Sequence, residues 1–216
     1  EDALSAATKR LERFGSRFKP IHTRFSSLDT ALNEIGVGQV DVLVADFGVS
    51  SYQIDTAGRG FSFRFDGPLD MRMDSSGDAP LREKLDEVDE GTLADIIYEF
   101  GEERRSRAVA KAIKANSPTT TLELADLIRS VVRKSKDGID PATRTFQALR
   151  IWVNSELDEI RRLLGLLPDV PRPGVQVALI SFHSLEDRLV KRAFKSFADP
   201  CDCPKALPVC QCGKIP

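Results

Sequence analysis

The sequence lacks the features that mark several large classes of protein. Its 216 residues contain no apolar run near the roughly 18 residues that a membrane-spanning helix needs. The N-terminal residues carry charges where a signal peptide has its apolar stretch, so we expect no export. Neither sign of charge dominates, because 31 Lys plus Arg face 33 Asp plus Glu, which excludes a uniformly basic protein that coats nucleic acid. We therefore expect a cytoplasmic protein without a membrane segment.

The two ends of the chain alternate between helical and strand patterns. Apolar spacing predicts a helix over residues 3–14 and the start of another at 25–28. Residues 40–45 are nearly continuously apolar, which predicts a strand buried on both faces of a parallel sheet. A helix, a strand and a helix are then predicted over residues 143–164, 175–182 and 185–197. This alternation is typical of a doubly wound α/β sheet.

The middle of the chain follows a different pattern. Residues 56–80 are rich in Gly, Asp, Arg and Pro without a clean period, so we expect a long ordered loop, which in a compact domain is usually functional. Helical spacing then predicts helices over residues 92–100, 102–115 and 121–132. We therefore predict an α/β domain in two parts, an inserted loop and all-helical module, and a cysteine-rich tail. The α/β domain comprises residues 1–54 and 143–200, the inserted module residues 55–142, and the tail residues 201–216.

Polar residues follow both predicted strands, where ligands of open α/β sheets bind. Asp46 ends the first strand, and the second leads into Ser-Phe-His-Ser-Leu-Glu-Asp-Arg at 181–188. A ligand is not the only explanation, since a strand-end Asp often caps a helix. Ser184 with Asp187 is likewise an ordinary helix start, and an isolated histidine such as His183 is more often structural than a base.

The loop segment 59–74 concentrates side chains that suit nucleic acid. It holds three Phe, two Met, three Arg and three Asp around two glycines and a proline. Stacking faces, guanidinium groups and fixed carboxylates together can hold an unstacked base and its phosphates. A well-packed loop with its own ion pairs is the alternative. The arginines proposed to contact RNA here are Arg59, Arg64 and Arg72.

These motifs resemble the ribosomal RNA small subunit methyltransferase H family. The resemblance rests on residues 46–53, 59–63, 66–74, 98–104, 142–154 and 180–188, with the spacing between them. It extends from about Ala3 to Phe194. It implies a Rossmann-like methyltransferase sheet with an inserted helical module, in agreement with the patterns above. It also implies the activity, transfer of a methyl group from S-adenosylmethionine to the exocyclic N4 of a cytidine in the decoding region of the small-subunit rRNA.

The resemblance also implies roles for single residues. Phe25, Asp46 and Gln53 match family positions beside the cofactor, and Asp46 also matches the place where the methyl group meets the acceptor amine. The lone pair of a cytosine N4 is delocalised into the ring, so a hydrogen bond to a fixed oxygen would favour a pyramidal, reactive nitrogen. Asp46 is our candidate for this role. Further catalytic candidates are Asp66, Asp70, Asn154 and His183.

Parts of the family's cofactor site have no counterpart in this sequence. The family's glycine-rich loop and acidic ribose-binding residue both precede the segment that resembles residues 1–11, and its last strand follows the tail. We therefore expect the 216-residue chain alone to bind S-adenosylmethionine weakly and to be inactive. The alternative function is a non-catalytic RNA- or ribosome-binding protein of the same fold, which the intact motifs at Asp46 and 59–74 oppose.

Four cysteines gather in the tail. Cys201, Cys203, Cys210 and Cys212 form C-x-C-x6-C-x-C. Three readings stay open: a tetrahedral zinc site, two disulfides, or a tail with reduced thiols. A small metal- or redox-responsive module centred on these cysteines is a third function, which the rest of the chain does not favour.

Positive charge is local in this sequence. Residues 101–114 hold five cationic and two acidic side chains, and residues 185–195 hold four and two. A solvated helix face is the default explanation. In a protein that grips rRNA phosphates, these residues become contacts: Arg104, Arg105, Arg107, Lys111, Arg188, Lys191 and Arg192. The expected partner is the small-subunit rRNA or the small ribosomal subunit, and no oligomeric state is predicted.

Overall fold

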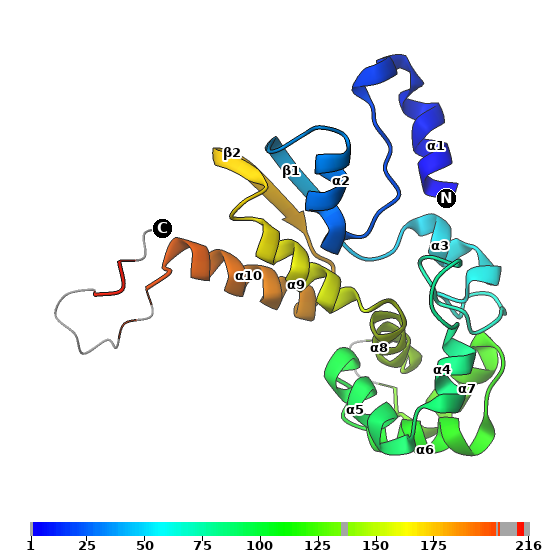
Figure 1. Ribbon diagram of the computed structural model, residues 1–216. Helices are drawn as coiled ribbons and strands as arrows, with labels where there is room; N and C mark the ends of the chain where they lie inside the picture. The colour runs from blue at the N-terminus through cyan, green and yellow to red at the C-terminus, as the bar shows by residue number, and fades with distance from the viewer. Residues whose placement is uncertain (1, 135–137, 202, 204–210, 214–216) are drawn as a thin grey trace. The chain divides into compact units, whose positions relative to one another are not determined.

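The computed structural model describes residues 2–134, 138–201, 203 and 211–213 (Figure 1). The chain divides into two compact units. The α/β unit comprises residues 1–47 and 157–216, and the helical unit comprises residues 48–156. None of the described helices is long and apolar enough to cross a membrane.

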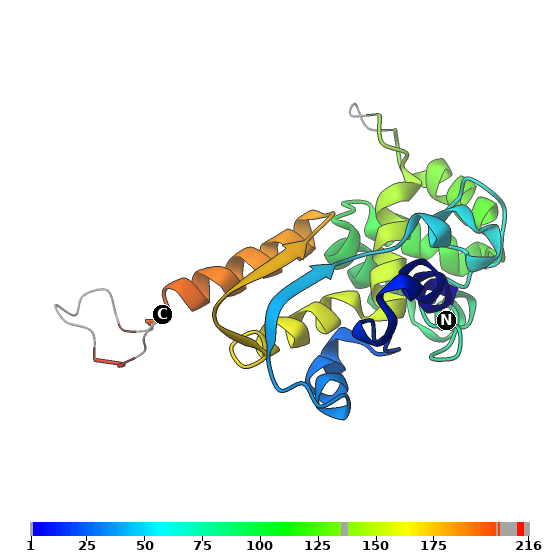
Figure 2. The same cartoon turned by 90° about the horizontal axis from the view of Figure 1, so that it is seen from above.

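The α/β unit is built around two parallel strands, β1 (Val40–Asp46) and β2 (Pro171–Ile180). Both arrows point the same way in Figure 2, and the register pairs Val42 with Gln176 and Asp46 with Ile180. The helices of this unit are α1 (Asp2–Leu11), α2 (Leu28–Glu34), α9 (Glu156–Leu166) and α10 (Ser184–Ala198), with short 3-10 turns at Glu12–Arg17 and Phe25–Ser27. After β2 the chain turns back into α10 (Figure 2). The mixed α/β class predicted from the sequence is confirmed.

The two faces of this small sheet differ. Leu43 and Ala45 of β1 are buried, whereas Val42 and Val44 are 61% and 64% exposed. The prediction of a strand buried on both faces is therefore wrong for the described residues. The reason is the alternation of side chains along a strand, which leaves one face of these two strands open. Ile180 of β2 lies on a similarly exposed position, at 46%.

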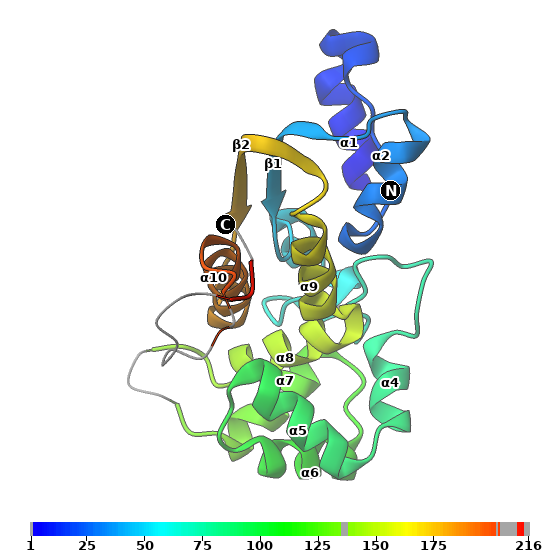
Figure 3. The same cartoon turned by 60° about the vertical axis from the view of Figure 1, so that its left-hand side comes forward.

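The helical unit is a bundle preceded by a long loop. Its helices are α3 (Ser51–Asp55), α4 (Leu81–Glu87), α5 (Glu90–Gly101), α6 (Ser106–Asn116), α7 (Thr121–Val131) and α8 (Ala142–Asn154), with a 3-10 turn at Ala57–Arg59. Local capping explains two of the starts. The Asp89 side chain accepts a hydrogen bond from the Thr92 N–H before α5, and Thr120 forms a capping box with Glu123 before α7. Figure 3 shows α5, α6, α7 and α8 grouped together.

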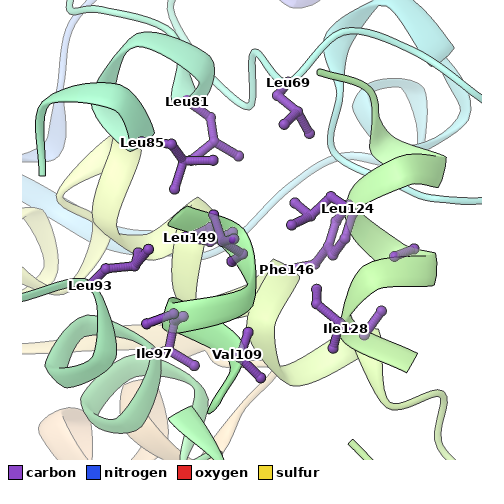
Figure 4. Packing of buried hydrophobic residues seen from close by; sticks show 14 of the residues in the cluster. Leu69, Leu81, Leu85, Leu93, Ile97, Val109, Leu124, Ile128, Phe146 and Leu149 are labelled. Carbon is purple, nitrogen blue, oxygen red and sulfur yellow. The ribbon is translucent and has the colours of Figure 1, made fainter. Parts of the chain in front are cut away.

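The core of this unit is almost fully closed. Leu93, Ile97, Leu124, Ile128 and Leu149 are all 0% exposed, and their side chains converge from α5, α7 and α8 in Figure 4. A β-carbon on Gly101 of α5 would lie 2.5 Å from the Arg144 carbonyl oxygen of α8. The absence of a side chain at this one position therefore lets the two helices approach closely.

The sequence predicted one helix over 143–164, but the structure has two. Ser155 takes the left-handed conformation (φ 52°), which ends α8 and starts α9 at Glu156. A bidentate ion pair, 2.8 and 2.9 Å, joins the Arg150 guanidinium to the Glu156 carboxylate across this break.

The two compact units divide the chain after Phe47 and after Glu156, so α8 belongs to the helical unit. The division predicted from the sequence instead grouped residues from 143 onward with the α/β part. Phe146, Leu149 and Val153 belong to the helical core, which explains this difference.

Candidate functional site

Asp46 is the last residue of β1 and is exposed. It lies opposite Ile180, and the N–H of the next residue, Phe47, donates a hydrogen bond to the Ile180 carbonyl at 3.1 Å. The two strands thus end together, and the Asp46 carboxylate stands at their common carboxyl end. In open α/β sheets this is the edge at which ligands bind.

Phe25 lies close to the same strand end. Its ring contacts the buried Phe47 ring edge to face, with centroids 5.7 Å apart, and it stays 39% exposed. The neighbouring Ser26 donates to the Glu159 carboxylate of α9 from its N–H (3.0 Å) and its hydroxyl (3.1 Å). These bonds fix the segment that carries Phe25. Phe25 therefore packs against the residue that follows Asp46.

The turn that follows β2 is fixed by a buried carboxylate. Glu186 is 0% exposed, and its Oε2 accepts hydrogen bonds from the N–H groups of Phe182 (2.8 Å) and His183 (3.4 Å). Burial alone would raise the pKa of Glu186, but the adjacent His183 imidazole, 3.2 Å away, and these N–H donors lower it overall. The helix start therefore uses His183 and Glu186, one residue earlier than the Ser184 and Asp187 that the sequence predicted.

Phe182 is a residue to which the sequence analysis gave no role. It is 69% exposed and lies two residues after Ile180, the partner of Asp46. The signal for it was the alternation of β2, in which residues 176, 178 and 180 are exposed and the next position of the series is 182. Glu186 was also missed, because a carboxylate inside a charged segment is ordinarily expected at the surface.

In the helical unit, the loop 56–80 is held by two polar side chains. The Arg59 guanidinium donates to the carbonyl oxygens of Arg72 (2.7 Å) and Met73 (3.0 Å). The Asn154 amide of α8 donates to the Met71 carbonyl and accepts from the Met73 N–H, both at 2.7 Å. Met71 is fully buried and has a positive φ of 59°. The loop is therefore rigidly tied to α8 through a strained residue.

Two glycines allow this loop to close on itself. A β-carbon on Gly60, whose φ is +70°, would collide with the Pro68 carbonyl oxygen, and one on Gly67 would collide with the Ala57 carbonyl oxygen. The lack of a side chain at these two glycines thus lets distant parts of the loop backbone come close together.

Asp70 and Arg72 form a bidentate pair. The Arg72 Nε and Nη2 donate to the two Asp70 carboxylate oxygens at 2.7 and 2.9 Å, and the Arg72 N–H adds a third bond. Burial would raise the pKa of Asp70, but the hydrogen bonds and the charge of Arg72 outweigh it and lower the pKa. Both side chains are thus engaged within the loop.

Asp66 binds the start of α7. Its Oδ1 accepts hydrogen bonds from the N–H groups of Gly67 (3.1 Å) and Leu122 (3.2 Å). A hydrogen bond from the Thr120 side chain and then the one from Leu122 lower the pKa of Asp66. Asp66, which the sequence analysis proposed as a further catalytic candidate, connects the loop to a helix N-terminus.

Two further residues proposed from the sequence contact near neighbours within the helical unit. The Gln53 side-chain oxygen accepts from the N–H (2.9 Å) and hydroxyl (3.2 Å) of Ser50, which caps α3. Arg64 is largely exposed, with its guanidinium 3.5 Å from the Asp55 carboxylate.

The basic residues proposed to contact RNA lie at the surface of their units. In the helical unit, exposed cations stand at the start of α6 and along it: Arg104, Arg105, Arg107 and Lys111. In the α/β unit, exposed cations line α10: Arg188, Lys191 and Arg192. Lys191 contacts the Asp187 carboxylate one turn earlier, at 2.9 Å.

Three of the four tail cysteines are described, and their sulfur atoms converge. The Sγ atoms of Cys201, Cys203 and Cys212 all lie within 4.8 Å of one another. Cys210, the fourth cysteine of the predicted zinc motif, lies outside the described residues.

The parallel strand pair, with an exposed carboxylate at its carboxyl end and a separate helical unit, is consistent with the Rossmann-like methyltransferase class. The chain matches the model of the MraW methylase family over residues 1–216 and belongs to that family.

Curated relatives agree with this assignment. The chain is 47% identical over 222 residues to the ribosomal RNA small subunit methyltransferase H of Citrifermentans bemidjiense, covering 100% of this chain and 71% of that protein. It is 47% identical over 220 residues to the protein of the same name from Trichlorobacter lovleyi (99% and 70%). It is 52% identical over 200 residues to that from Sorangium cellulosum (90% and 64%).

Proposed function

We propose that this protein uses S-adenosylmethionine to methylate the exocyclic N4 of a cytidine in the decoding region of small-subunit ribosomal RNA. The observation that carries the proposal is the exposed Asp46 carboxylate at the carboxyl end of a parallel strand, beside Phe25, in a member of the MraW methylase family. The names of the relatives support rRNA as the substrate. Action on small-subunit rRNA or on the small ribosomal subunit would place the protein in the cytoplasm.

The residues at the strand end fit S-adenosylmethionine. The partly exposed face of Phe25 suits the adenine ring, and the Asp46 oxygens suit polar parts of the cofactor. Gln53 is a third proposed contact, from its position in the family motif. When bound, the cofactor supplies an electrophilic methyl group on a sulfonium.

Asp46 orients the acceptor amine in this proposal. A carboxylate accepts hydrogen bonds only, so it selects the N–H groups of a cytosine amine over the carbonyl oxygen of a uracil. Accepting such a bond holds the nitrogen lone pair out of conjugation with the ring, and it directs the proton that the nitrogen must lose toward an oxygen. An exposed strand-end carboxylate keeps its acceptor sites accessible to a substrate for both effects.

The further catalytic candidates act through structure in this proposal. Asp66, Asp70 and Asn154 all bind backbone or arginine donors of the helical unit. His183 lies against Glu186 at the start of α10. These residues hold the loop 56–80 and the turn after β2 in shape. The exposed Phe182 ring at that turn suits stacking on the unpaired target base.

The exposed cations on α6 and α10, with Arg64, form the proposed RNA contacts. Arg59 and Arg72 remain part of this set as proposed from the sequence, although hydrogen bonds within the loop engage both guanidinium groups. Their contribution to RNA binding would therefore come from the charge of the loop rather than from a freely moving side chain. The tail cysteines have no part in this chemistry.

The decisive experiment replaces Asp46 by Asn in the full-length protein and measures methyl transfer from labelled S-adenosylmethionine to small-subunit rRNA. We expect kcat to fall by about 10² to 10³, as for loss of one transition-state hydrogen-bond partner, and cofactor binding to weaken by a smaller factor. Asp41→Asn is the matched control, because Asp41 lies near the other end of the same strand and pairs with Arg172 at 2.7 Å. Full activity of Asp46→Asn would assign the amine-orienting role to another residue.

Nucleoside analysis of the product tests the position of the methyl group. We expect N4-methylcytidine, and a methyl group on the ring carbon or the ribose would contradict the proposal. RNA that binds without any methylated product would favour the non-catalytic alternative.

A charge reversal of Arg104 and Arg107 tests the RNA surface, since each lost phosphate contact lowers the salt slope of binding by about 1. Reversal of Arg82 and Arg161, which pair with Asp86 and Asp158, is the control.

A further inference from the structure

The tail after α10 brings thiols together in a way that the methylation chemistry does not use. Cys201, Cys203 and Cys212 come from two ends of a twelve-residue segment, yet their Sγ atoms all lie within 4.8 Å of one another. We propose that these three thiolates bind a zinc ion.

The distance between two of the sulfurs matches a shared tetrahedral metal. A zinc–sulfur bond is about 2.3 Å, so two sulfurs on one tetrahedral zinc lie about 3.8 Å apart. The Sγ atoms of Cys201 and Cys212 are 3.8 Å apart. A disulfide would hold its two sulfurs at about 2.05 Å, so the two sulfur atoms are not bonded to each other. The geometry of this pair therefore favours one ion bound by both sulfurs.

A backbone donor supports the third sulfur. The Gln211 N–H donates a hydrogen bond to the Cys203 Sγ at 3.4 Å. N–H donors to a ligand atom are the usual outer partners of metal-bound groups, because they orient the ligand and stabilise its charge. Three thiolates so close together repel one another unless a cation neutralises them.

Binding requires each thiol to release its proton, so zinc uptake becomes weaker as the pH falls. Zinc takes four ligands, and three thiolates leave one coordination position for a further ligand. The ion has no place in the methyl transfer proposed above. Loss of zinc and loss of methylation are therefore separate outcomes.

The test is metal analysis of the purified 216-residue chain after exhaustive dialysis against a metal-free buffer. We expect about one zinc per chain, and cobalt substitution should give the intense visible bands of tetrahedral cobalt with thiolate charge-transfer absorption. Cys201→Ser, Cys203→Ser and Cys212→Ser should each lower zinc affinity by more than tenfold. Gln211→Ala is the matched control, because its backbone rather than its side chain contacts the sulfur, and it should keep the zinc.

Circular dichroism of each variant shows whether the helices are intact, so a loss of zinc is separated from a loss of folding. Thiol titration of the native chain, before and after addition of a chelator, gives a second readout: the three thiols should become reactive only when zinc is removed. A chain that stays zinc-free when zinc is supplied, that carries disulfides or an iron–sulfur cluster, or that keeps its zinc in the serine variants would overturn the proposal.

Discussion

The helical unit and the α/β unit bury their apolar side chains differently. In the helical unit, Leu93, Ile97 and Leu149 are 0% exposed and contribute to one closed core. In the α/β unit, Val42 and Val44 project from a strand at 61% and 64% exposure. The helical unit therefore forms its closed apolar core within residues 48–156, whereas one face of the described strands leaves apolar side chains in contact with solvent.

Polar groups follow the same division. Asp70, Arg72 and Asn154 of the helical unit are all engaged by hydrogen bonds that shape one loop. Asp46 of the α/β unit is exposed at a strand end. The two carboxylates thus differ in surroundings: Asp70 is held by Arg72 within the loop, whereas Asp46 is accessible to a substrate.

The largest expected effect is the loss of stability when a buried side chain of the helical unit is shortened, compared with an exposed side chain of β1. Leu149→Ala should cost about 2–5 kcal/mol, because it leaves a cavity in a closed core. Val44→Ala should cost less than about 1 kcal/mol, the range that strand propensity spans. Native-state hydrogen exchange of amides in α8 and in β1 measures each change in its own unit. Equal costs would mean that the exposed strand face is covered in solution.

The next effect concerns the hydrogen bonds by which Asn154 holds the loop 56–80 of the helical unit. Asn154→Ala should cost about 1–3 kcal/mol, because the Met71 carbonyl and the Met73 N–H lose their partner in a largely buried place. Faster hydrogen exchange at Met73 and faster proteolysis near residues 74–78 would report the loosened loop. Asn116→Ala is the control, since the Asn116 amide only contacts the Ala112 carbonyl on the exposed side of α6. Unchanged exchange at Met73 would show that Arg59 holds the loop alone.

The smallest effect is a pH dependence. The folded-state pKa of Asp70 lies below its unfolded value, so its contribution to stability is present above the unfolded pKa and is lost as the pH falls through the folded pKa. A single carboxylate changes stability by at most about 1.4 kcal/mol per pH unit. Acid titration of the unfolding free energy should therefore be less steep in Asp70→Asn than in the native chain. An identical slope would show that the pair with Arg72 contributes nothing to acid sensitivity.

Much of the fold could be predicted from periodicity alone. Both strands and the helices of the middle section follow their apolar spacing, because the pattern of burial and the pattern of sequence have the same period. The break between α8 and α9 could not, since it depends on Ser155 taking a left-handed conformation while the Arg150–Glu156 pair spans the turn. Burial on both faces of β1 was also predicted wrongly, because apolar residues in a strand do not reveal how many neighbours it has.

The site was predictable as a set of motifs and less so as a set of roles. Strand-end position singled out Asp46, which does end β1, whereas Phe25 was proposed only from the family resemblance. The same reasoning could not show that Asp66 binds the N-terminus of α7 or that Glu186 is buried beneath the turn after β2. Those contacts join residues far apart in the chain or depend on local packing, and residue type alone does not encode them.

The pairing of β1 with β2 has a consequence for the order of folding. Ala45 pairs with Leu179, so the two strands are separated by about 130 residues of chain. Closing a flexible loop of that length costs roughly 4 kcal/mol in chain entropy. The helical unit is contiguous and rich in local contacts, so it should fold first and convert most of that loop into a compact body. Pulse-labelling hydrogen exchange would then detect protected amides in α5 to α8 before those of the strands. The inserted helices therefore act as an assembly aid for the sheet, which closes late between two distant parts of one polypeptide.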